Sequence, residues 1–297
     1  MSVVCPVHQS ENCVKLYKTF DKNTIIKQYQ ETFQINVTKY FEGIENLSLY
    51  CCNYTGYCFF VPFTLKGDND FYMQLSKMEH YYPDWKWEYD EALRQISPND
   101  VVLEIACGNG HFLKAASKKA RRVVGFDITT IPYNDENINI FSMDFDSFFK
   151  TNTELFDLVV AFQYLEHIDD VNHFFSVVSK VLKPKGKLIL ALPNSKLSFI
   201  KNEILNFPPH HLGWWTQRSL KKVAEYFNFN IHISKTEPLY PKYINRKLYN
   251  EELARIQRFG ILGRIYNSLT HKIYLYLQKK LSSLFKGHSF LILMIKK

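Results

Sequence analysis

An acidic, glycine-containing segment, Glu104-Ile-Ala-Cys-Gly-Asn-Gly110, has the residue types and spacing to bind a small polar ligand. It follows an apolar run and precedes an amphipathic one, which predicts a strand, a tight turn and a helix N-terminus. Backbone N–H groups and the positive end of the helix would face the ligand, and Gly108 and Gly110 permit its close approach. Asp127 ends the next apolar run, 19 residues after Gly108, which is about the spacing of a carboxylate that binds ribose hydroxyls. The sequence therefore predicts a nucleotide-type site.

A second set of residues with suitable chemistry is rich in cysteine. Cys5-Pro-Val-His8 and Cys51-Cys-Asn-Tyr-Thr-Gly-Tyr-Cys58 resemble the two halves of a zinc ribbon, whose ligands would be Cys5, His8, Cys52 and Cys58. The second spacing is longer than usual, because five residues separate Cys52 from Cys58 where a two-residue gap is typical. The alternative is a ribbon that no longer binds metal and whose cysteines act as small apolar residues.

From residue 101 onward, the segments that must position these residues alternate between apolar and amphipathic. Apolar runs are separated by amphipathic segments, which predicts a mostly parallel sheet with helices on both faces. Ligands of such sheets bind at the carboxyl ends of the strands, where the glycine turn is expected. The expected strands are 101–105, 123–126, 138–141, 156–161, 187–192, 229–233 and 289–295. The expected helices are 111–120, one that ends near 182, and 215–227 with Thr216 as its cap.

Outside this alternating region the sequence predicts smaller units. Residues 1–97 are expected to form a ribbon-like part and a helical, aromatic lid, with one or two amphipathic helices over 23–41 and a short helix that begins at Asp68 or Asp70. Residues 98–297 would form the ligand-binding domain, with a helical insert at about 238–288. Apolar residues recur every four positions in this insert, with lysines between them. Such a helix would either pack on the domain or contact an anionic membrane surface.

Composition and charge narrow the class of protein. The chain has 297 residues, and 46% of them are hydrophobic, which is enough for a substantial core. The net charge of +8 is uneven: residues 240–297 contain 12 Lys and Arg against 2 Glu, which leaves 25 basic against 27 acidic residues in the first 239. A nearly neutral main part argues against a nucleic-acid enzyme with a basic face everywhere. The basic tail is compatible with an anionic acceptor or a membrane surface.

The beginning of the chain shows no basic segment followed by an apolar one, and the sequence has no run of 18 apolar residues. It therefore predicts neither a secretion signal nor a membrane-spanning helix. Six cysteines in such a chain predict reduced thiols and a cytoplasmic protein, with peripheral membrane contact through the basic insert as a further expectation.

Taken in order, these segments resemble the class I S-adenosylmethionine-dependent methyltransferases. Glu104 to Gly110 is similar to that family's first motif, although Ala106 stands where the first glycine is usual. Phe156-Asp-Leu-Val-Val-Ala-Phe-Gln-Tyr-Leu-Glu-His167 and Leu182-Lys-Pro-Lys-Gly-Lys-Leu-Ile-Leu190 are similar to later motifs. A dehydrogenase would need a third glycine where His111-Phe-Leu113 stands. The resemblance implies a Rossmann-like, seven-stranded fold and S-adenosylmethionine as the cofactor.

The resemblance also implies roles for individual residues. Glu104 would accept hydrogen bonds from the ammonium group of the cofactor, Asp127 would bind its ribose, and Asp144 and Phe145 would lie at its adenine. The implied cofactor-binding set is completed by Ala106, Cys107, Gly108, Asn109, Gly110, Ile128 and Phe162.

Phe207-Pro-Pro-His-His-Leu-Gly-Trp-Trp-Thr216 resembles the acceptor-facing loop of small-molecule and glycan methyltransferases. The two prolines would stiffen the loop, and His211, or else His210, would take the proton from an acceptor hydroxyl. Alternatively, both histidines hydrogen-bond carbonyls of the loop, and methyl transfer depends on positioning alone. The resemblance implies O-methylation of a sugar, glycan or small metabolite. The alternatives are an RNA or protein methyltransferase, and a non-catalytic binding module in which Ala106 blocks the cofactor.

Overall fold

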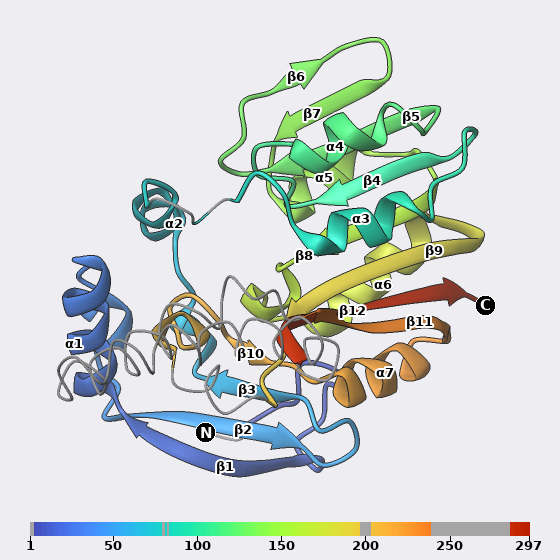
Figure 1. Cartoon of the computed structure of the whole chain (residues 1–297). Coiled ribbons are helices and arrows are strands. Elements are labelled where there is room, and N and C mark those ends of the chain that lie inside the picture. The colour runs from blue at the N-terminus through green and yellow to red at the C-terminus, as the bar shows by residue number, and fades with distance from the viewer. Residues whose placement is uncertain (1–2, 79–80, 82, 197–202, 239–285) are drawn as a thin grey trace, which may run out of the picture. The chain divides into compact units, whose positions relative to one another are not determined.

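The computed structural model describes residues 3–78, 81, 83–196, 203–238 and 286–297. The chain divides into two compact units, Met1–Lys235 with Phe290–Lys297, and Thr236–Ser289. The first unit contains the elements discussed below (Figure 1), apart from the end of β11, Phe229–Pro238, and the start of β12, Lys286–Lys296, which belong to the second. The predicted basic helical insert at about 238–288 lies almost entirely outside the described residues, so its proposed membrane contact stays a prediction.

The larger sheet has eight strands in the order β11-β12-β9-β8-β4-β5-β7-β6. Its centre is parallel, from β9 through β8, β4 and β5 to β7, and β6 pairs antiparallel with β7 at one edge. Seven of these strands correspond to the seven predicted ones, and the two-residue β6 was not predicted. The bounds are β4 Val101–Ile105, β5 Arg122–Asp127, β6 Tyr133–Asn134, β7 Ile138–Ser142, β8 Phe156–Phe162, β9 Leu182–Pro193, β11 Phe229–Pro238 and β12 Lys286–Lys296.

Helices cover both faces of this sheet, as the alternating sequence predicts. On one face, buried side chains of α5, α6 and α7 pack against Val101, Leu103 and Ile105. On the other face, side chains of α3 and α4 pack against Val102, because successive strand residues point to opposite faces. The helix bounds are α3 Trp87–Leu93, α4 His111–Ala116, α5 Phe145–Thr151, α6 Val171–Val181 and α7 Gln217–Tyr226.

Two of the helix caps confirm the sequence analysis. Asp68 caps α2, Asn69–Ser76, by accepting a hydrogen bond from the backbone N–H of Phe71. Thr216 caps α7, where its hydroxyl accepts from the N–H of Ser219 at 3.0 Å. The predicted 23–41 helical region forms α1, Lys22–Phe33, followed by the short 3-10 helix η1, Thr38–Phe41.

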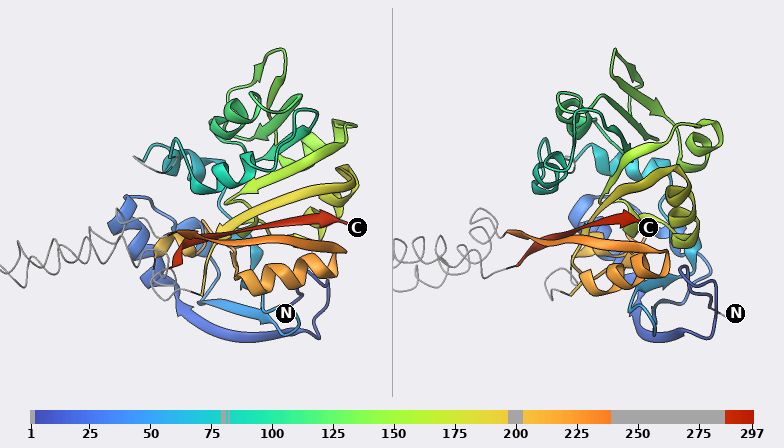
Figure 2. Two further views of the ribbon diagram at one scale, coloured as in Figure 1. Left: turned by 45° about the vertical axis from the view of Figure 1, so that its right-hand side comes forward. Right: turned by 90° about the vertical axis from the view of Figure 1, so that its right-hand side faces the viewer.

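A second, four-stranded sheet has the order β1-β2-β3-β10 and is built mainly from the N-terminal region. Its strands are β1 Val14–Asp21, β2 Asn46–Cys52, β3 Cys58–Val61 and β10 Gly213–Trp214. The sequence did not predict β1, because this strand is mostly exposed and therefore lacks a regular alternation of apolar residues. Figure 2 shows these blue N-terminal strands alongside α7, and Lys222 of α7 donates to the Tyr54 carbonyl at 2.7 Å.

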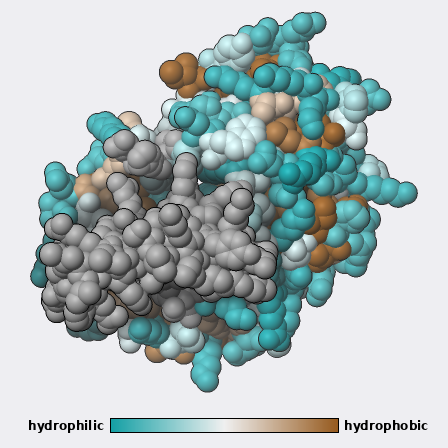
Figure 3. Space-filling model, viewed as in Figure 1, coloured by the Kyte–Doolittle hydropathy of each residue, from teal (hydrophilic) through white to brown (hydrophobic). Residues whose placement is uncertain are grey.

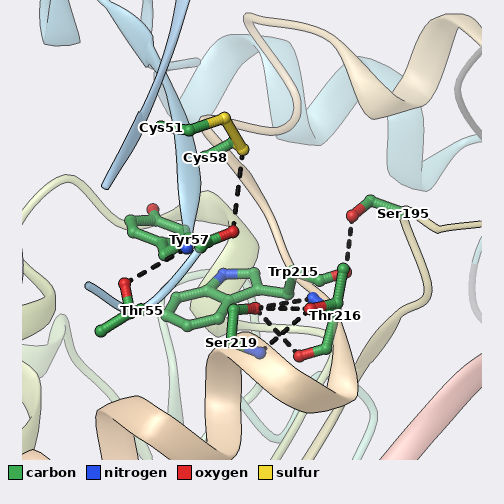
Figure 4. Close-up of a disulfide and its surroundings, with 9 residues drawn as sticks. Cys51, Thr55, Tyr57, Cys58, Ser195, Trp215, Thr216 and Ser219 are labelled. Carbon is green, nitrogen blue, oxygen red and sulfur yellow. Dashed lines mark hydrogen bonds between the residues drawn. A yellow bond between two sulfur atoms is a disulfide. The ribbon is translucent and has the colours of Figure 1, made fainter. Parts of the chain in front are cut away.

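Strand β10 comes from the predicted acceptor-facing loop, so that loop completes the N-terminal sheet. Gly213 lies opposite Phe59 of β3, and Trp214 lies opposite Cys58. The next residue, Trp215, stacks on Tyr57 with ring centroids 4.0 Å apart (Figure 4). The division into domains 1–97 and 98–297 remains a prediction, but this pairing joins its two sides.

The expectation that all cysteines are reduced is wrong for one pair. Cys51 and Cys58 are opposite each other in the register of β2 and β3, and the structure joins them in a disulfide (Figure 4). Cys5, Cys13, Cys52 and Cys107 are free thiols.

The described part of the face drawn in Figure 3 is mainly hydrophilic, with small apolar patches between polar side chains. Among the described residues, no helix is both long and apolar enough to cross a membrane.

Candidate active site

The glycine turn lies where the sequence predicts, between β4 and α4. Three of its residues have positive φ angles: 55° at Ala106, 51° at Gly108 and 68° at Gly110, which is the N-cap of α4. A side chain at position 110 would also collide with Ile140, whose Cδ1 would lie 2.9 Å from the added Cβ. The turn therefore keeps its backbone close to β7. Helix α4 begins directly after it, so the N–H groups of the first helical turn lie at the carboxyl end of β4.

Glu104, the fourth residue of β4, is buried on the face covered by α3 and α4. Its side chain is 2% exposed, and Oε2 has no hydrogen-bond partner among the described residues. Burial raises the pKa of this carboxyl well above its ordinary value, the nearby Lys86 acts in the opposite direction, and Asp127 raises it further. An unpartnered buried acceptor is costly to the folded protein unless a ligand satisfies it. A ligand ammonium group would fit this acceptor in both charge and hydrogen bonding.

Asp127, the last residue of β5, closes the turn from the neighbouring strand. One carboxylate oxygen accepts from the N–H of Gly108 at 3.0 Å, and the other accepts from the N–H and hydroxyl of Thr129 at 2.8 and 2.7 Å. A carboxylate has about four acceptor sites, so one of them remains after these three bonds. The carboxylate is held at the carboxyl end of the sheet and can still accept a bond from a ligand hydroxyl.

Other residues of the implied cofactor-binding set differ in their surroundings. Asp144 caps α5 by accepting from the N–H and hydroxyl of Ser147, and these bonds lower its pKa. The ring of Phe162 is 5% exposed and packs between core aromatic rings, so its side chain lies inside the protein. Ile128 is 42% exposed, and Met143, whose N–H bonds the Asp127 carbonyl, is 36% exposed. The sequence analysis did not single out Met143, although it directly precedes the Asp144-Phe145 pair.

The segment predicted to face the acceptor, 207–216, brings three imidazoles together with a buried carboxyl. His210, His211 and His167 each offer a ring nitrogen within 4.8 Å of the others. His167 belongs to the short helix η3, Leu165–His167, which follows β8. Because β8 is the parallel neighbour of β4, residues that follow the two strands emerge at the same edge of the sheet. The loop is fixed to η3, since the N–H of Leu212 donates to the Glu166 carbonyl at 2.8 Å.

The two histidines of the loop differ in their hydrogen bonds. His210 has both ring nitrogens engaged: Nδ1 lies 2.8 Å from the Leu205 carbonyl and Nε2 lies 2.9 Å from the Tyr81 hydroxyl. His210 thus contacts a carbonyl, as the alternative expects of both histidines, but Leu205 lies just before the loop. In His211, Nδ1 lies 3.2 Å from the side-chain oxygen of Asn206, and Nε2 lies 3.9 Å from a carboxylate oxygen of Glu166, beyond hydrogen-bond distance. Burial lowers the pKa of His211 well below its ordinary value, so its imidazole is neutral.

Comparison with known proteins identifies the family of this chain. The model of a family described as a methyltransferase domain matches residues 78–233, which is more than half of the chain. The chain belongs to this methyltransferase domain family. The match begins in the segment before α3 and ends in β11, so it contains Glu104, Asp127 and the three histidines.

Individual relatives are more distant. A ubiquinone biosynthesis O-methyltransferase of Bartonella tribocorum is 28% identical over 104 residues, which are 32% of this chain and 42% of the relative. A probable S-adenosylmethionine-dependent methyltransferase of Mycolicibacterium smegmatis is 27% identical over 162 residues, or 53% of this chain and 62% of the relative. The chain thus matches less than two thirds of either protein. A solved SAM-dependent methyltransferase from Archaeoglobus fulgidus is 20% identical, with a TM-score of 0.46 over 70% of this chain and 91% of that one.

The departure from the methyltransferase motif at Ala106 has a conformational cost. Ala106 has a φ of 55°, a conformation that costs a residue with a Cβ about 1–2 kcal/mol and glycine almost nothing. We expect Ala106→Gly to stabilise the protein by about 1 kcal/mol, measured as a higher midpoint in chemical denaturation, because relief of the strain exceeds the extra flexibility of the unfolded chain. A loss of stability in this variant would show that the methyl group contributes packing that outweighs the strain.

The buried carboxyl of Glu166 predicts a specific pH dependence of stability. Neither of its oxygens has a partner among the described residues, and burial raises its pKa from 4.5 to about 8. The folded protein therefore holds a proton that the unfolded chain releases, so this group's stabilising contribution is complete below pH 4.5 and is lost as the pH rises to 8. The loss is up to about 1.4 kcal/mol per pH unit. Compared with the wild type, Glu166→Gln should gain stability steadily from pH 5 to pH 8 in urea titrations. A constant difference between the two proteins would contradict the assignment.

Proposed function

We propose that the chain binds S-adenosylmethionine at the turn between β4 and α4 and transfers its methyl group to an oxygen of a sugar, glycan or other small metabolite. The observation that carries the proposal is the buried Glu104 carboxyl, whose Oε2 has no hydrogen-bond partner among the described residues, beside a turn with backbone N–H groups and a second carboxylate, Asp127. This arrangement suits a ligand with an ammonium group and a ribose. Family membership supports the same reaction class.

The residues around the turn would each hold one part of the cofactor. Glu104 would bind the ammonium group, Asp127 would bind a ribose hydroxyl, and the N–H groups that follow Gly108 would bind the carboxylate. The exposed apolar side chains of Ile128 and Met143 would flank the adenine, with Asp144 and Phe145 at its edge. Bound in this way, the cofactor supplies an electrophilic methyl group on a positively charged sulfur.

His211 would act as the general base toward the acceptor. Its neutral Nε2 can accept the proton of an acceptor hydroxyl while the oxygen forms its bond to the methyl carbon and the carbon–sulfur bond breaks. The contact of Nδ1 with Asn206 would orient the ring. The imidazolium that forms would lie 3.9 Å from a carboxyl oxygen of Glu166. His210 would be a positioning residue, because both of its nitrogens are already engaged.

Titration calorimetry with S-adenosylmethionine tests the cofactor assignment. We expect one cofactor molecule to bind per chain. An absence of binding up to millimolar cofactor would contradict the proposed methyltransferase activity. A screen of metabolite extracts with cofactor carrying a labelled methyl group then tests the acceptor. Label in a small hydroxyl compound would support the proposal, whereas label in RNA or protein would favour those acceptors. Cofactor binding without any transfer would favour a non-catalytic binding module.

A further inference from the structure

Four side chains far from the glycine turn form a compact cluster of metal-binding type. Cys5, His8, Cys13 and Cys52 each offer one ligand atom, and these four atoms all lie within 4.8 Å of one another. All three cysteines are free thiols with at most 1% of their surface exposed. Thiolate sulfur and imidazole nitrogen are the ligands that zinc prefers in structural sites.

Two of the distances within the cluster match an edge of a zinc tetrahedron. With Zn–S at about 2.3 Å and Zn–N at about 2.0–2.1 Å, a tetrahedral angle places sulfur and nitrogen roughly 3.5–3.6 Å apart. The structure has Nδ1 of His8 at 3.6 Å from Sγ of Cys5 and at 3.5 Å from Sγ of Cys52. Two of the three sulfurs therefore lie at the expected distance from the same imidazole nitrogen.

The backbone near the first two ligands forms a tight loop. The N–H of Gln9, which has a φ of 52°, donates to the Cys5 carbonyl at 2.9 Å, and the N–H of Cys5 donates to the Ser10 carbonyl at 3.0 Å. Cys13 comes directly after this loop, and its carbonyl accepts from the N–H of Asn53 at 2.7 Å. The loop thereby places Cys13 next to the end of β2, where Cys52 lies.

The observed ligand set corrects the one expected from sequence. Cys58 is not part of the cluster, because it lies opposite Cys51 on β3 and is bonded to it. Cys51 and Cys52 are consecutive strand residues and so point to opposite faces of the sheet, which places Cys58 on the face away from the cluster. Cys13 provides the fourth ligand instead, and the long gap between Cys52 and Cys58 no longer matters.

We propose that Cys5, His8, Cys13 and Cys52 bind one Zn²⁺ ion in a closed, structural site. Four protein ligands complete the tetrahedron, so no position remains for a substrate. The site would join the N-terminal loop to β2, and the same loop contacts α6 of the methyltransferase fold. There the N–H and side-chain amide of Asn172 donate to the carbonyls of Pro6 and Val7, each at 2.9 Å.

Metal analysis of the full-length protein, purified with a reductant and with added Zn²⁺ followed by desalting, tests this proposal. We expect about one zinc per chain in the wild type and at least a tenfold lower content in Cys13→Ser. The matched control is Cys51→Ser with Cys58→Ser, which removes the disulfide without leaving an unpaired thiol and should keep the full zinc content. Zinc-free wild type, or loss of zinc in the control with retention in Cys13→Ser, would overturn the proposal.

A second measurement keeps the test decisive if Cys13→Ser fails to fold. Co²⁺ added to the metal-free wild type should give the intense visible absorption of a tetrahedral thiolate site, and Zn²⁺ should then abolish it. Mass mapping of alkylated thiols should show Cys5, Cys13 and Cys52 protected until a chelator is added. Weak, octahedral-type cobalt absorption, or a disulfide among these three cysteines in the reduced protein, would contradict zinc binding.

Discussion

Replacement of Glu104 by Gln should weaken S-adenosylmethionine binding by about tenfold to a hundredfold at pH 7, because a charge-assisted hydrogen bond to the cofactor ammonium is lost. The variant should also abolish a pH dependence. Burial raises the pKa of Glu104 in the free protein, and a bound ammonium group would lower it again. Binding should therefore release a proton, and wild-type affinity should rise with pH by up to about tenfold per unit.

Calorimetry below about pH 7, where an α-amino group stays protonated, can measure both effects. Repeating the titration in buffers of different ionisation enthalpy counts the protons released, which we expect to approach one for the wild type and zero for Glu104→Gln. Asp127→Asn is the comparison variant: it should weaken binding at every pH while binding still releases protons, because burial is the main cause of the raised pKa of Glu104. Wild-type affinity that does not vary with pH would mean that the ammonium group lies elsewhere.

Replacement of His211 by Gln should lower kcat by about a hundredfold to ten-thousandfold, the usual contribution of a general base, while cofactor affinity stays as in the wild type. The wild type should also show no loss of kcat/KM on acidification through pH 6.5, because burial lowers the pKa of His211 well below that ordinary value. Initial rates over pH 5–8, measured with an acceptor found in the metabolite screen, provide both tests.

The comparison variant for the second prediction is Asn206→Asp, which keeps the size of the residue that contacts Nδ1 of His211. A negative charge at that position would stabilise the imidazolium, so the acid limb of kcat/KM should move to higher pH without loss of the base. A His211→Gln enzyme with normal turnover would show that the methyl transfer needs positioning alone. A wild-type acid limb at pH 6.5 would assign the proton transfer to a more exposed group.

The alternation of apolar and amphipathic segments was sufficient to predict the large sheet, because each buried parallel strand reads as a continuous apolar run. Val101–Ile105 and Phe156–Phe162 are examples in which every residue, or nearly every one, is buried. The N-terminal sheet was harder to predict. The burial of β1 does not alternate, and β10 has only two residues, so its pairing with β3 depends on tertiary contacts that local sequence does not encode.

The candidate site divides in the same way. Glu104, Gly108 and Asp127 were predictable because their spacing follows from one strand, one turn and one further strand. The association of His167 with His210 and His211 joins segments 43 and 44 residues apart, and no periodicity connects them. The proximity of Cys13 to Cys52 was missed for a related reason. The expected ribbon was inferred from the spacing of cysteines along the sequence, whereas the alternation of side chains along a strand decides which thiols share a face of the sheet.

The pairing of β10 with β3 has a consequence for exchanging parts between related proteins. The segment that carries His210 and His211 continues directly into a strand whose hydrogen-bonding partner lies about 150 residues earlier in the chain. A chimera that receives this loop from a relative would keep its own β3, and the pairing between β3 and the new β10 would be mismatched. If the loop binds the acceptor as we propose, acceptor preference should transfer only when both segments are exchanged together, although they lie far apart in the sequence.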